Sequence, residues 1–228
     1  MWPITVAVLF NAVYLKGDTV ILSFLRSQSE VGLYGAAYRV LEIYSQVAMI
    51  IMGIVVPLMA FNWSRNLKEG FKKYYQLSFD IIMVIALPIL IFTIIFGTKI
   101  MVLIAGDKFT LSGVPLKILS LAVFGVYLGA VFGHTAVAIN KQKQTMWVYL
   151  STAFITVIGY LIFIPLYGMH GAAWMTVFSE LYTGILLFIL IRHYTETKLS
   201  YKNFSKIILA GIIMGASIWP IQHLSIFY

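Results

Sequence analysis

Long apolar stretches alternate with short polar gaps along almost the whole chain. We place seven candidate spanning segments, approximately at residues 5–25, 34–61, 75–96, 114–139, 146–166, 172–191 and 204–227. A helix needs about 20 apolar residues to cross a bilayer. The run IIMVIALPILIFTIIF, at 81–96, is apolar on every side, whereas the strand of a membrane barrel alternates polar and apolar residues. The pattern therefore predicts an all-α, polytopic transmembrane helical bundle.

The gaps contain residues that commonly end helices. These are Asn62, Asn66, Gly97, Gly106 with Asp107, Gly113, the run NKQKQ at 140–144 and the run YGMHG at 167–171. The gap between the third and fourth segments also contains IMVLIAG, at 100–106. This run is too short to span, so we expect it at the membrane interface.

Composition supports a membrane protein and excludes several other classes. Hydrophobic residues make up 61% of the 228 residues and charged residues 11%, which is more apolar surface than a soluble domain of this size can bury. The net charge of +8 comes mainly from residues that flank the predicted spans, so we do not expect nucleic acid as a partner. There is no cysteine, which excludes disulfides and thiolate metal sites.

The distribution of Lys and Arg predicts an orientation in the membrane. Ten cations fall in gaps on one side of the predicted bundle: Arg65, Lys68, Lys72, Lys73, Lys141, Lys143, Arg192, Lys198, Lys202 and Lys206. The gaps on the other side contain Arg26, Lys99 and Lys108, with Lys117 near a helix end. Because cytoplasmic loops are enriched in cations, we expect the N-terminus in the cytoplasm and the C-terminus outside, in the cell membrane.

Ionisable residues inside the predicted spans are the first candidates for function, because a charge in the bilayer needs a partner or a hydrated cavity. They are Lys16, Asp18, Arg39, Glu42, Asp80 and Glu180. Lys16 and Asp18 point about 200° apart on a helix, so they cannot both face one partner. Lys16 has no obvious neighbour of opposite sign along the chain, and we expect it to face a hydrated cavity.

Gly35, Arg39, Glu42 and Gln46 form a stripe at helical spacing on the second segment. Arg39 and Glu42 are three residues apart and can pair with each other, while Asp18 is a second possible partner for Arg39. Two interpretations stay open for these charges. They either neutralise one another and lock two helices together, or they face a substrate.

The remaining candidates differ in their expected depth in the membrane. Glu180 falls near mid-bilayer and is either an ion-coupling acid or a buried neutral acid bonded to Ser179 or a facing helix. Asp80 lies near a helix entry and is expected to reach the interface. His134 is a weaker candidate for a proton relay. The histidines do not have metal-ligand spacing, and no motif for nucleophilic catalysis or phosphate binding appears, so we expect no enzyme activity, metal or cofactor.

The stretch YLKGDTVILSFLRSQSEVGLYGAAYRVLE resembles the start of the C-terminal half of polysaccharide flippases, which belong to the multidrug/oligosaccharidyl-lipid/polysaccharide exporter superfamily. The matching residues are Asp18, Val31, Gly32, Tyr34, Ala37, Tyr38, Arg39 and Glu42. The position of Pro57, the run IAGDKFTLSGVPLKILSLAV and the run AINKQKQTMW are also similar to the family.

The resemblance implies a non-enzymatic transporter built from two helical lobes around a central cavity. Such a protein moves a lipid-linked oligosaccharide across the membrane for cell-surface polysaccharide biosynthesis. It also implies that Lys16 and Arg39, with Asp18 and Glu42, contact the substrate, because a pyrophosphate in low dielectric needs a counter-charge. Seven helices are about half of what the family has, so we expect a single lobe, either a truncated chain or one that works with a missing N-terminal lobe or as a dimer.

Three other functions stay open. An ion-coupled multidrug or cation antiporter lobe of the same superfamily would depend on Glu180 or Asp18 more than on the cations. A non-transporting membrane interaction subunit would only bind another lobe. A membrane-embedded glycosyl- or acyltransferase would need a base and an acceptor site at one face of the membrane, for which the sequence offers only His170 and scattered carboxylates.

Overall fold

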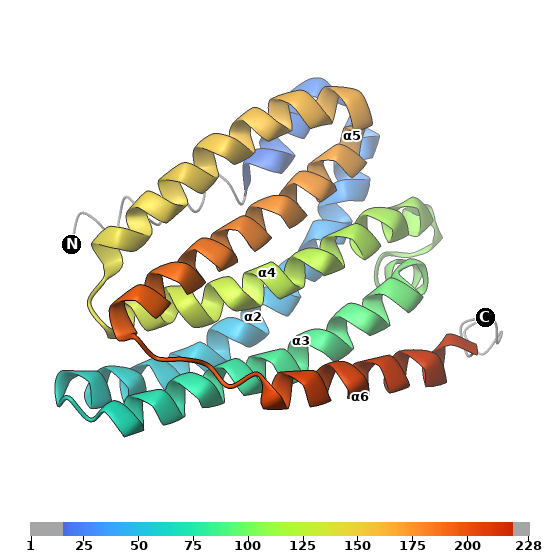
Figure 1. Cartoon of the computed structure of the whole chain (residues 1–228). Helices are drawn as coiled ribbons and strands as arrows, with labels where there is room; N and C mark the ends of the chain where they lie inside the picture. Colours follow the sequence, from blue (N-terminus) through green and yellow to red (C-terminus); the bar gives the residue numbers. More distant parts are fainter. Residues whose placement is uncertain (1–15, 221–228) are drawn as a thin grey trace.

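The computed structural model describes residues 16–220, and almost all of this part of the chain is helical (Figure 1). A helix over residues 16–25 leads into the rest of the bundle. It is followed by α2 (Gln28–Ser64), α3 (Lys68–Ala105), the short 3-10 helix η1 (Asp107–Ser112), α4 (Gly113–Ala138), α5 (Gln142–Thr195) and α6 (Lys202–Ile218). The predicted all-α helical bundle is confirmed.

Four helical stretches in the described part are long and apolar enough to cross a membrane: α2, α3, α5 and the segment 107–138 that contains η1 and α4. The 54-residue α5 contains two predicted spans, and its helical geometry is interrupted at Gly168 (φ 58°, ψ −138°), inside the predicted gap. The predicted spans 5–25 and 204–227 extend outside the described residues. The chain is therefore a multi-pass membrane protein, and the count of seven spans stays a prediction.

One boundary differs clearly from the prediction. Gly97, which we expected to end a helix, lies inside α3, and the run at 100–106 continues this helix as far as Ala105 instead of forming a separate segment. Glycine serves close packing at this position instead of ending the helix, since a Cβ at Gly97 would lie 2.7 Å from Lys117 Cγ on α4. The helix ends at Gly106, whose φ of 87° favours glycine.

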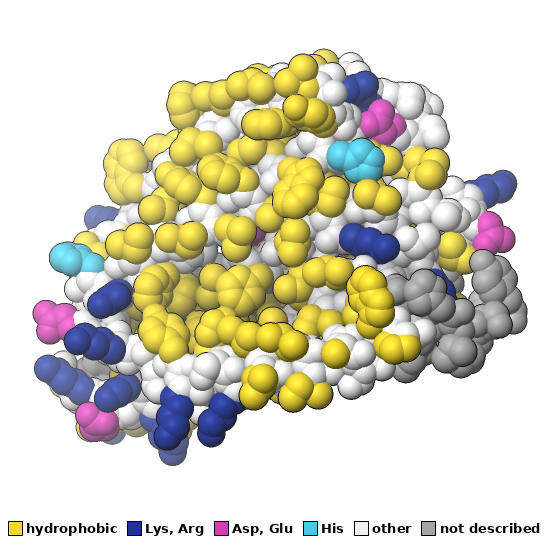
Figure 2. Space-filling model, turned by 45° about the vertical axis from the view of Figure 1, so that its right-hand side comes forward, with side chains coloured by type: hydrophobic (Ala, Val, Ile, Leu, Met, Phe, Trp, Pro, Cys, Tyr) yellow, Lys and Arg dark blue, Asp and Glu magenta, His cyan; other side chains and the backbone are white. Residues whose placement is uncertain are grey.

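The turns between helices lie alternately at the two ends of the bundle (Figure 1). The turns at 65–67 and 139–141 and the linker at 196–201 lie near one end, and the turn at 26–27, η1 and the break at Gly168 lie near the other. Lys and Arg side chains gather at one end of the face seen in Figure 2. This arrangement agrees with the predicted separation of cations, while the direction in which the chain crosses the membrane stays a prediction.

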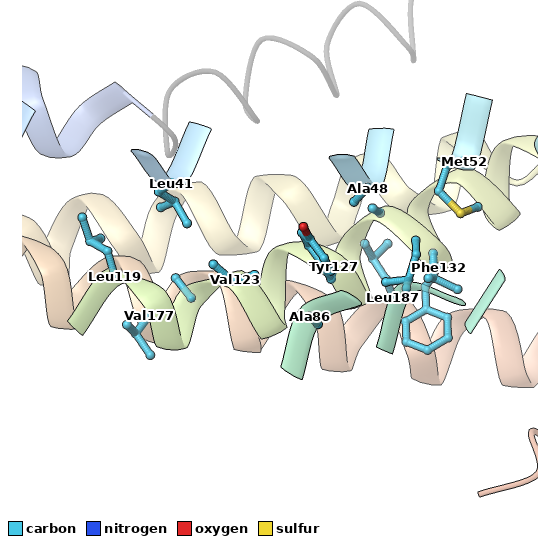
Figure 3. Packing of buried hydrophobic residues seen from close by; sticks show 14 of the residues in the cluster. Leu41, Ala48, Met52, Ala86, Leu119, Val123, Tyr127, Phe132, Val177 and Leu187 are labelled. Atoms are coloured by element: carbon cyan, nitrogen blue, oxygen red, sulfur yellow. The ribbon is translucent and has the colours of Figure 1, made fainter. Parts of the chain in front are cut away.

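The core of the lobe is centred on α4, which packs against α2, α3 and α5. Buried apolar residues from these helices meet around Val123, Tyr127 and Phe132 (Figure 3). The Tyr127 hydroxyl donates a 2.8 Å hydrogen bond to the carbonyl of Tyr44, which satisfies its polar group inside the core. Large apolar side chains remain exposed on the outer faces, as expected of helices that face lipid (Figure 2).

Candidate functional site: a cavity between α2, α4 and α5

A cavity of about 760 Å³ lies between Lys16, α2, α4 and α5. One wall carries charges from the first two helices, and the other carries polar residues of α4 and α5. The polar residues that line it are Lys16, Tyr38, Arg39, Glu42, Ser45, Gln46, His134, Tyr149, Glu180 and Thr183. Four of the five residues singled out from the sequence as translocation or ion-coupling candidates are therefore brought into one cavity; the exception is Asp18.

A cluster of three charges forms the α2 wall of the cavity. Glu42 accepts hydrogen bonds from Lys16 Nζ and, at 3.1 Å, from Arg39 Nη1. Lys16 Nζ also lies 5.2 Å from the centre of the Tyr38 ring, where the negative face of the aromatic system favours a cation. The cluster retains one net positive charge, and the side chains of Lys16 and Arg39 are 58% and 81% exposed. Both cations are therefore accessible to an anionic ligand.

The structure corrects one expectation and confirms another. Lys16 does have a neighbour of opposite sign, because the helical stripe on α2 places Glu42 beside it. The sequence could not reveal this contact, since the two residues are 26 positions apart. The predicted pair of Arg39 and Glu42 is confirmed.

Asp18 does not join this cluster. Its side chain is completely buried, and it points to the opposite side of its helix from Lys16, as the helical spacing predicted. Asp18 Oδ2 accepts a 2.6 Å hydrogen bond from the Tyr34 hydroxyl, and Oδ1 accepts one of 2.6 Å from the amide of Thr19. The proposed pairing of Asp18 with Arg39 is replaced by these neutral donors.

Two hydroxyl groups of α5 extend the buried hydrogen bonds around Asp18. Thr176 Oγ1 lies 3.3 Å from the Tyr34 oxygen and 3.5 Å from Asp18 Oδ2. The Tyr160 hydroxyl lies 3.1 Å from Thr176 Oγ1. These contacts join the helix at 16–25, α2 and both parts of α5. Sequence reasoning missed Tyr34, Tyr160 and Thr176 as partners, because no spacing rule relates residues on different helices.

Glu180 lines the cavity from the α5 side and is only 4% exposed. Its Oε1 has no hydrogen-bond donor among the described residues. Ser179, one of the partners considered for Glu180, does not bond to Oε1, and its hydroxyl donates to the carbonyl of Thr176 at 2.9 Å. A buried carboxyl oxygen without a donor is costly, so Glu180 offers an acceptor for a proton, a cation or a donor group of a ligand.

The close approach of α4 fixes the position of Glu180. A Cβ added at Gly125 would lie 2.5 Å from the carbonyl carbon of Glu180 and 2.6 Å from the amide nitrogen of Leu181. Only glycine allows these two backbones to approach so closely. The α4 backbone therefore holds the backbone of Glu180 in place from the side of the core.

His134 and Thr183 complete the second wall. His134 Nδ1 lies 2.9 Å from the carbonyl of Ala130, so Nδ1 carries a proton and donates to that oxygen. Thr183 shares a 3.0 Å hydrogen bond with Thr152, within α5. This wall is thus lined by hydrogen-bonding groups, and none of its described residues is a Lys or Arg.

Asp80 lies away from the cavity. Its Oδ1 accepts from Gln76 and its Oδ2 accepts from Asn203, each at 2.8 Å. Gln76 also bonds both backbone groups of Ser200, at 2.7 and 3.1 Å. These contacts attach the linker at 196–201 and the start of α6 to α3. Asp80 therefore has a structural role in holding α6 against α3.

The fold is that of one half of known transporters. The lobe is similar to the structure of the lipid II flippase MurJ in an inward closed conformation, with a TM-score of 0.79, 18% identity and coverage of 96% of this chain and 46% of that one. It is also similar to a MOP superfamily transporter from Pyrococcus furiosus, with a TM-score of 0.73, 16% identity and coverage of 94% and 50%. A multidrug resistance MATE family transporter gives a TM-score of 0.72 at 18% identity, with coverage of 96% and 51%. Identities this low support the fold alone.

Sequence comparison places the chain in a family. A relative from Haloferax volcanii, described as the probable low-salt glycan biosynthesis flippase Agl15, is 23% identical over 203 residues, which cover 87% of this chain and 43% of the relative. The chain thus spans less than half the length of that relative. The model of the polysaccharide biosynthesis protein family matches residues 1–114, half of the chain and the part that contains Lys16, Arg39 and Glu42. This protein belongs to the polysaccharide biosynthesis protein family of membrane proteins, in agreement with the resemblance seen in its sequence.

Proposed function

We propose that the chain forms one lobe of a flippase that moves a lipid-linked oligosaccharide across the cell membrane during cell-surface polysaccharide biosynthesis. The observation that carries the proposal is the charge cluster of Lys16, Arg39 and Glu42 on a cavity wall inside a multi-pass lobe. Its excess positive charge suits the pyrophosphate of the lipid head, because an anion in a low-dielectric site needs a counter-charge.

The rest of the cavity suits the sugar. Gln46 and Tyr149, which are at least partly exposed, line it with donors and acceptors for hydroxyl groups. The lipid tail remains in the bilayer, against the apolar outer faces of the lobe. Transport requires a second lobe on the other side of the cavity, supplied by more of the same chain, by a separate chain or by a second copy.

Glu180 is our candidate for ion coupling. It is a buried acid on the cavity wall opposite the cations, and its unpaired Oε1 can accept a proton or a cation. This residue also supports the second candidate function, an ion-coupled antiporter lobe. An antiporter would depend most on the acids Glu180 and Asp18, whereas a carrier of lipid pyrophosphates would depend most on Lys16 and Arg39. Alanine scans of the two sets separate these functions.

Binding of an oligosaccharide linked to polyprenyl pyrophosphate, measured with the chain in lipid nanodiscs, tests the proposal. We expect Lys16→Ala and Arg39→Ala each to weaken binding by roughly 10-fold or more, since a charge-assisted hydrogen bond contributes about 1.5–3 kcal/mol. Inorganic pyrophosphate should compete, and high salt should weaken binding. Lys68→Ala, an exposed cation outside the cavity, serves as the control. Equal affinities for Lys16→Ala and Lys68→Ala would contradict the proposal.

A further inference from the structure

The break in α5 leaves backbone groups that the helix itself cannot satisfy. At Gly168 the chain turns with φ 58° and ψ −138°, so that α5 consists of a first arm before this residue and a second arm after it. The last carbonyls of the first arm and the first amides of the second arm lack partners within their own arms. In a membrane protein such groups need partners from elsewhere in the fold.

Arg26 supplies the partners for the first arm. Its Nη2 donates to the carbonyl oxygens of Ile164 and Pro165, at 3.0 and 2.7 Å, and its Nε donates to Ile164 at 3.2 Å. A cation at this position also complements the negative end of the helix dipole. Arg26 lies in the turn between the helix at 16–25 and α2, 138 residues from Ile164 in the sequence.

Glu30 supplies the partner for the second arm. Its Oε1 accepts a 2.6 Å hydrogen bond from the amide of Met169, at the positive end of that arm's dipole. The amide of Glu30 donates to Ser27 Oγ at the start of α2, as in a capping box. In a capping box the glutamate side chain would bond back to its own helix, whereas here it reaches α5.

Glycine is required at position 168 for two reasons. Its backbone conformation is one that other residues rarely adopt, and a Cβ there would collide with Glu30 Oε1. The break, the arginine and the glutamate therefore form one unit, which we call the bracket: Arg26, Glu30 and Gly168.

The bracket lies outside the cavity lining but joins the two helices that carry the cavity walls. Arg39 and Glu42 on α2 form one wall, and Glu180 and Thr183 on the second arm of α5 form part of the other. α5 packs mainly against α4 and makes few contacts with α2. Contacts at the ends of α2 and α5 therefore have a large effect on the distance between these two helices. The bracket connects the start of α2 directly to the start of the second arm.

We propose that Arg26 and Glu30 are positioning residues that set the distance between the α2 wall and the α5 wall of the cavity. They act by holding both broken ends of α5 against the turn at 26–27. The effect on the cavity geometry is independent of the cargo, while its consequence for transport rests on the proposed function.

Distances between spin labels in the full chain, in lipid nanodiscs, test this inference. The sequence contains no cysteine, so a label pair at Ile50→Cys on α2 and Ile189→Cys on α5 needs no background changes; both positions are exposed and outside the cavity lining. We expect Arg26→Ala and Glu30→Ala to broaden the distance distribution and add a longer component. Arg65→Ala, at the opposite end of the bundle, should leave it unchanged.

Conservative variants distinguish positioning from general loss of stability. Glu30→Gln keeps an acceptor for the Met169 amide and should retain the native distribution, and Arg26→Lys should restore most of it. Met169→Pro removes the amide donor together with the methionine side chain, which packs against the core, and proline is accepted at the first position of a helix. Met169→Ala, which keeps the amide, is therefore the matched control and should retain the native distribution. Met169→Pro should have the same effect as Glu30→Ala, with no further change when the two are combined. Unchanged distances in Met169→Pro and in both alanine variants would overturn the inference, whatever the binding assay with the pyrophosphate lipid shows.

Discussion

The Tyr34 hydroxyl donates a 2.6 Å hydrogen bond to Asp18, and both side chains are completely buried. This contact joins the first described helix to α2 and separates Asp18 from Lys16, which lies two residues earlier on the cavity side. A single helix thus presents an accessible cation to the cavity and a satisfied acid to the interior. Of the two neighbours, only Lys16 is accessible from the cavity.

Tyr34→Phe should destabilise the lobe by about 1–3 kcal/mol, because it removes a donor from a buried carboxyl group without changing the shape of the ring. The midpoint of thermal unfolding in detergent measures the effect. Tyr167→Phe is the control, since Tyr167 is 62% exposed. If the two variants unfold at the same temperature, the hydrogen bond between Tyr34 and Asp18 contributes little to stability.

Glu42→Gln should strengthen binding of inorganic pyrophosphate on the order of 2- to 5-fold at low salt, because Glu42 competes with an anionic ligand for Lys16 and Arg39. Calorimetric titration measures this effect.

Lys16→Ala should abolish polysaccharide export in cells that also produce the second lobe, while expression stays normal. Surface polysaccharide staining measures export. Normal export by Lys16→Ala would refute a role for this lysine in the cavity.

Glu180→Gln should leave binding of the pyrophosphate head almost unchanged, since Glu180 lies on the wall opposite the cations. Transport by the two-lobe protein in proteoliposomes should lose its response to an imposed ion or proton gradient, because the amide cannot take up a proton or balance a cation. Transport measured with and without the gradient separates the two effects. A full response to the gradient in Glu180→Gln would exclude Glu180 as the coupling acid.

Gly125→Ala should destabilise the lobe by about 1–3 kcal/mol, because the added methyl group would force the backbones of α4 and α5 apart at Glu180. Gly53→Ala on α2 is the matched control, since a Cβ there has no atoms within 4 Å. Removing a helical glycine at an open position should be neutral or slightly stabilising. Equal unfolding temperatures for the two variants would mean that α4 and α5 separate at little cost.

Asp80→Ala should loosen the attachment of α6, because it removes the acceptor that Gln76 and Asn203 share. We expect faster proteolysis in the linker at 196–201, and a similar increase for Asn203→Ala. The double variant should be cleaved no faster than Asp80→Ala alone, because the two residues act through one contact. Additive effects would show that they act independently.

Hydrophobic patterning determined the helical class, most of the helices and the end of the bundle at which the cations lie. These properties depend on local sequence, since a spanning helix satisfies its own backbone and must be apolar over its full length. The pair of Arg39 and Glu42 was predictable for the same reason, because residues three apart share one face of a helix. The prediction that Gly97 ends a helix was wrong. The local sequence does not distinguish a glycine that ends a helix from one that allows close packing inside it.

The sequence by itself thus determined a membrane-embedded helical lobe, its family resemblance and the set of charges that need an explanation. Only the tertiary structure decided their partners: Glu42 for Lys16, Tyr34 for Asp18, and the broken ends of α5 for Arg26 and Glu30. The physical reason is that helix periodicity fixes the face on which a side chain lies, whereas the group opposite that face depends on how α2, α4 and α5 pack together.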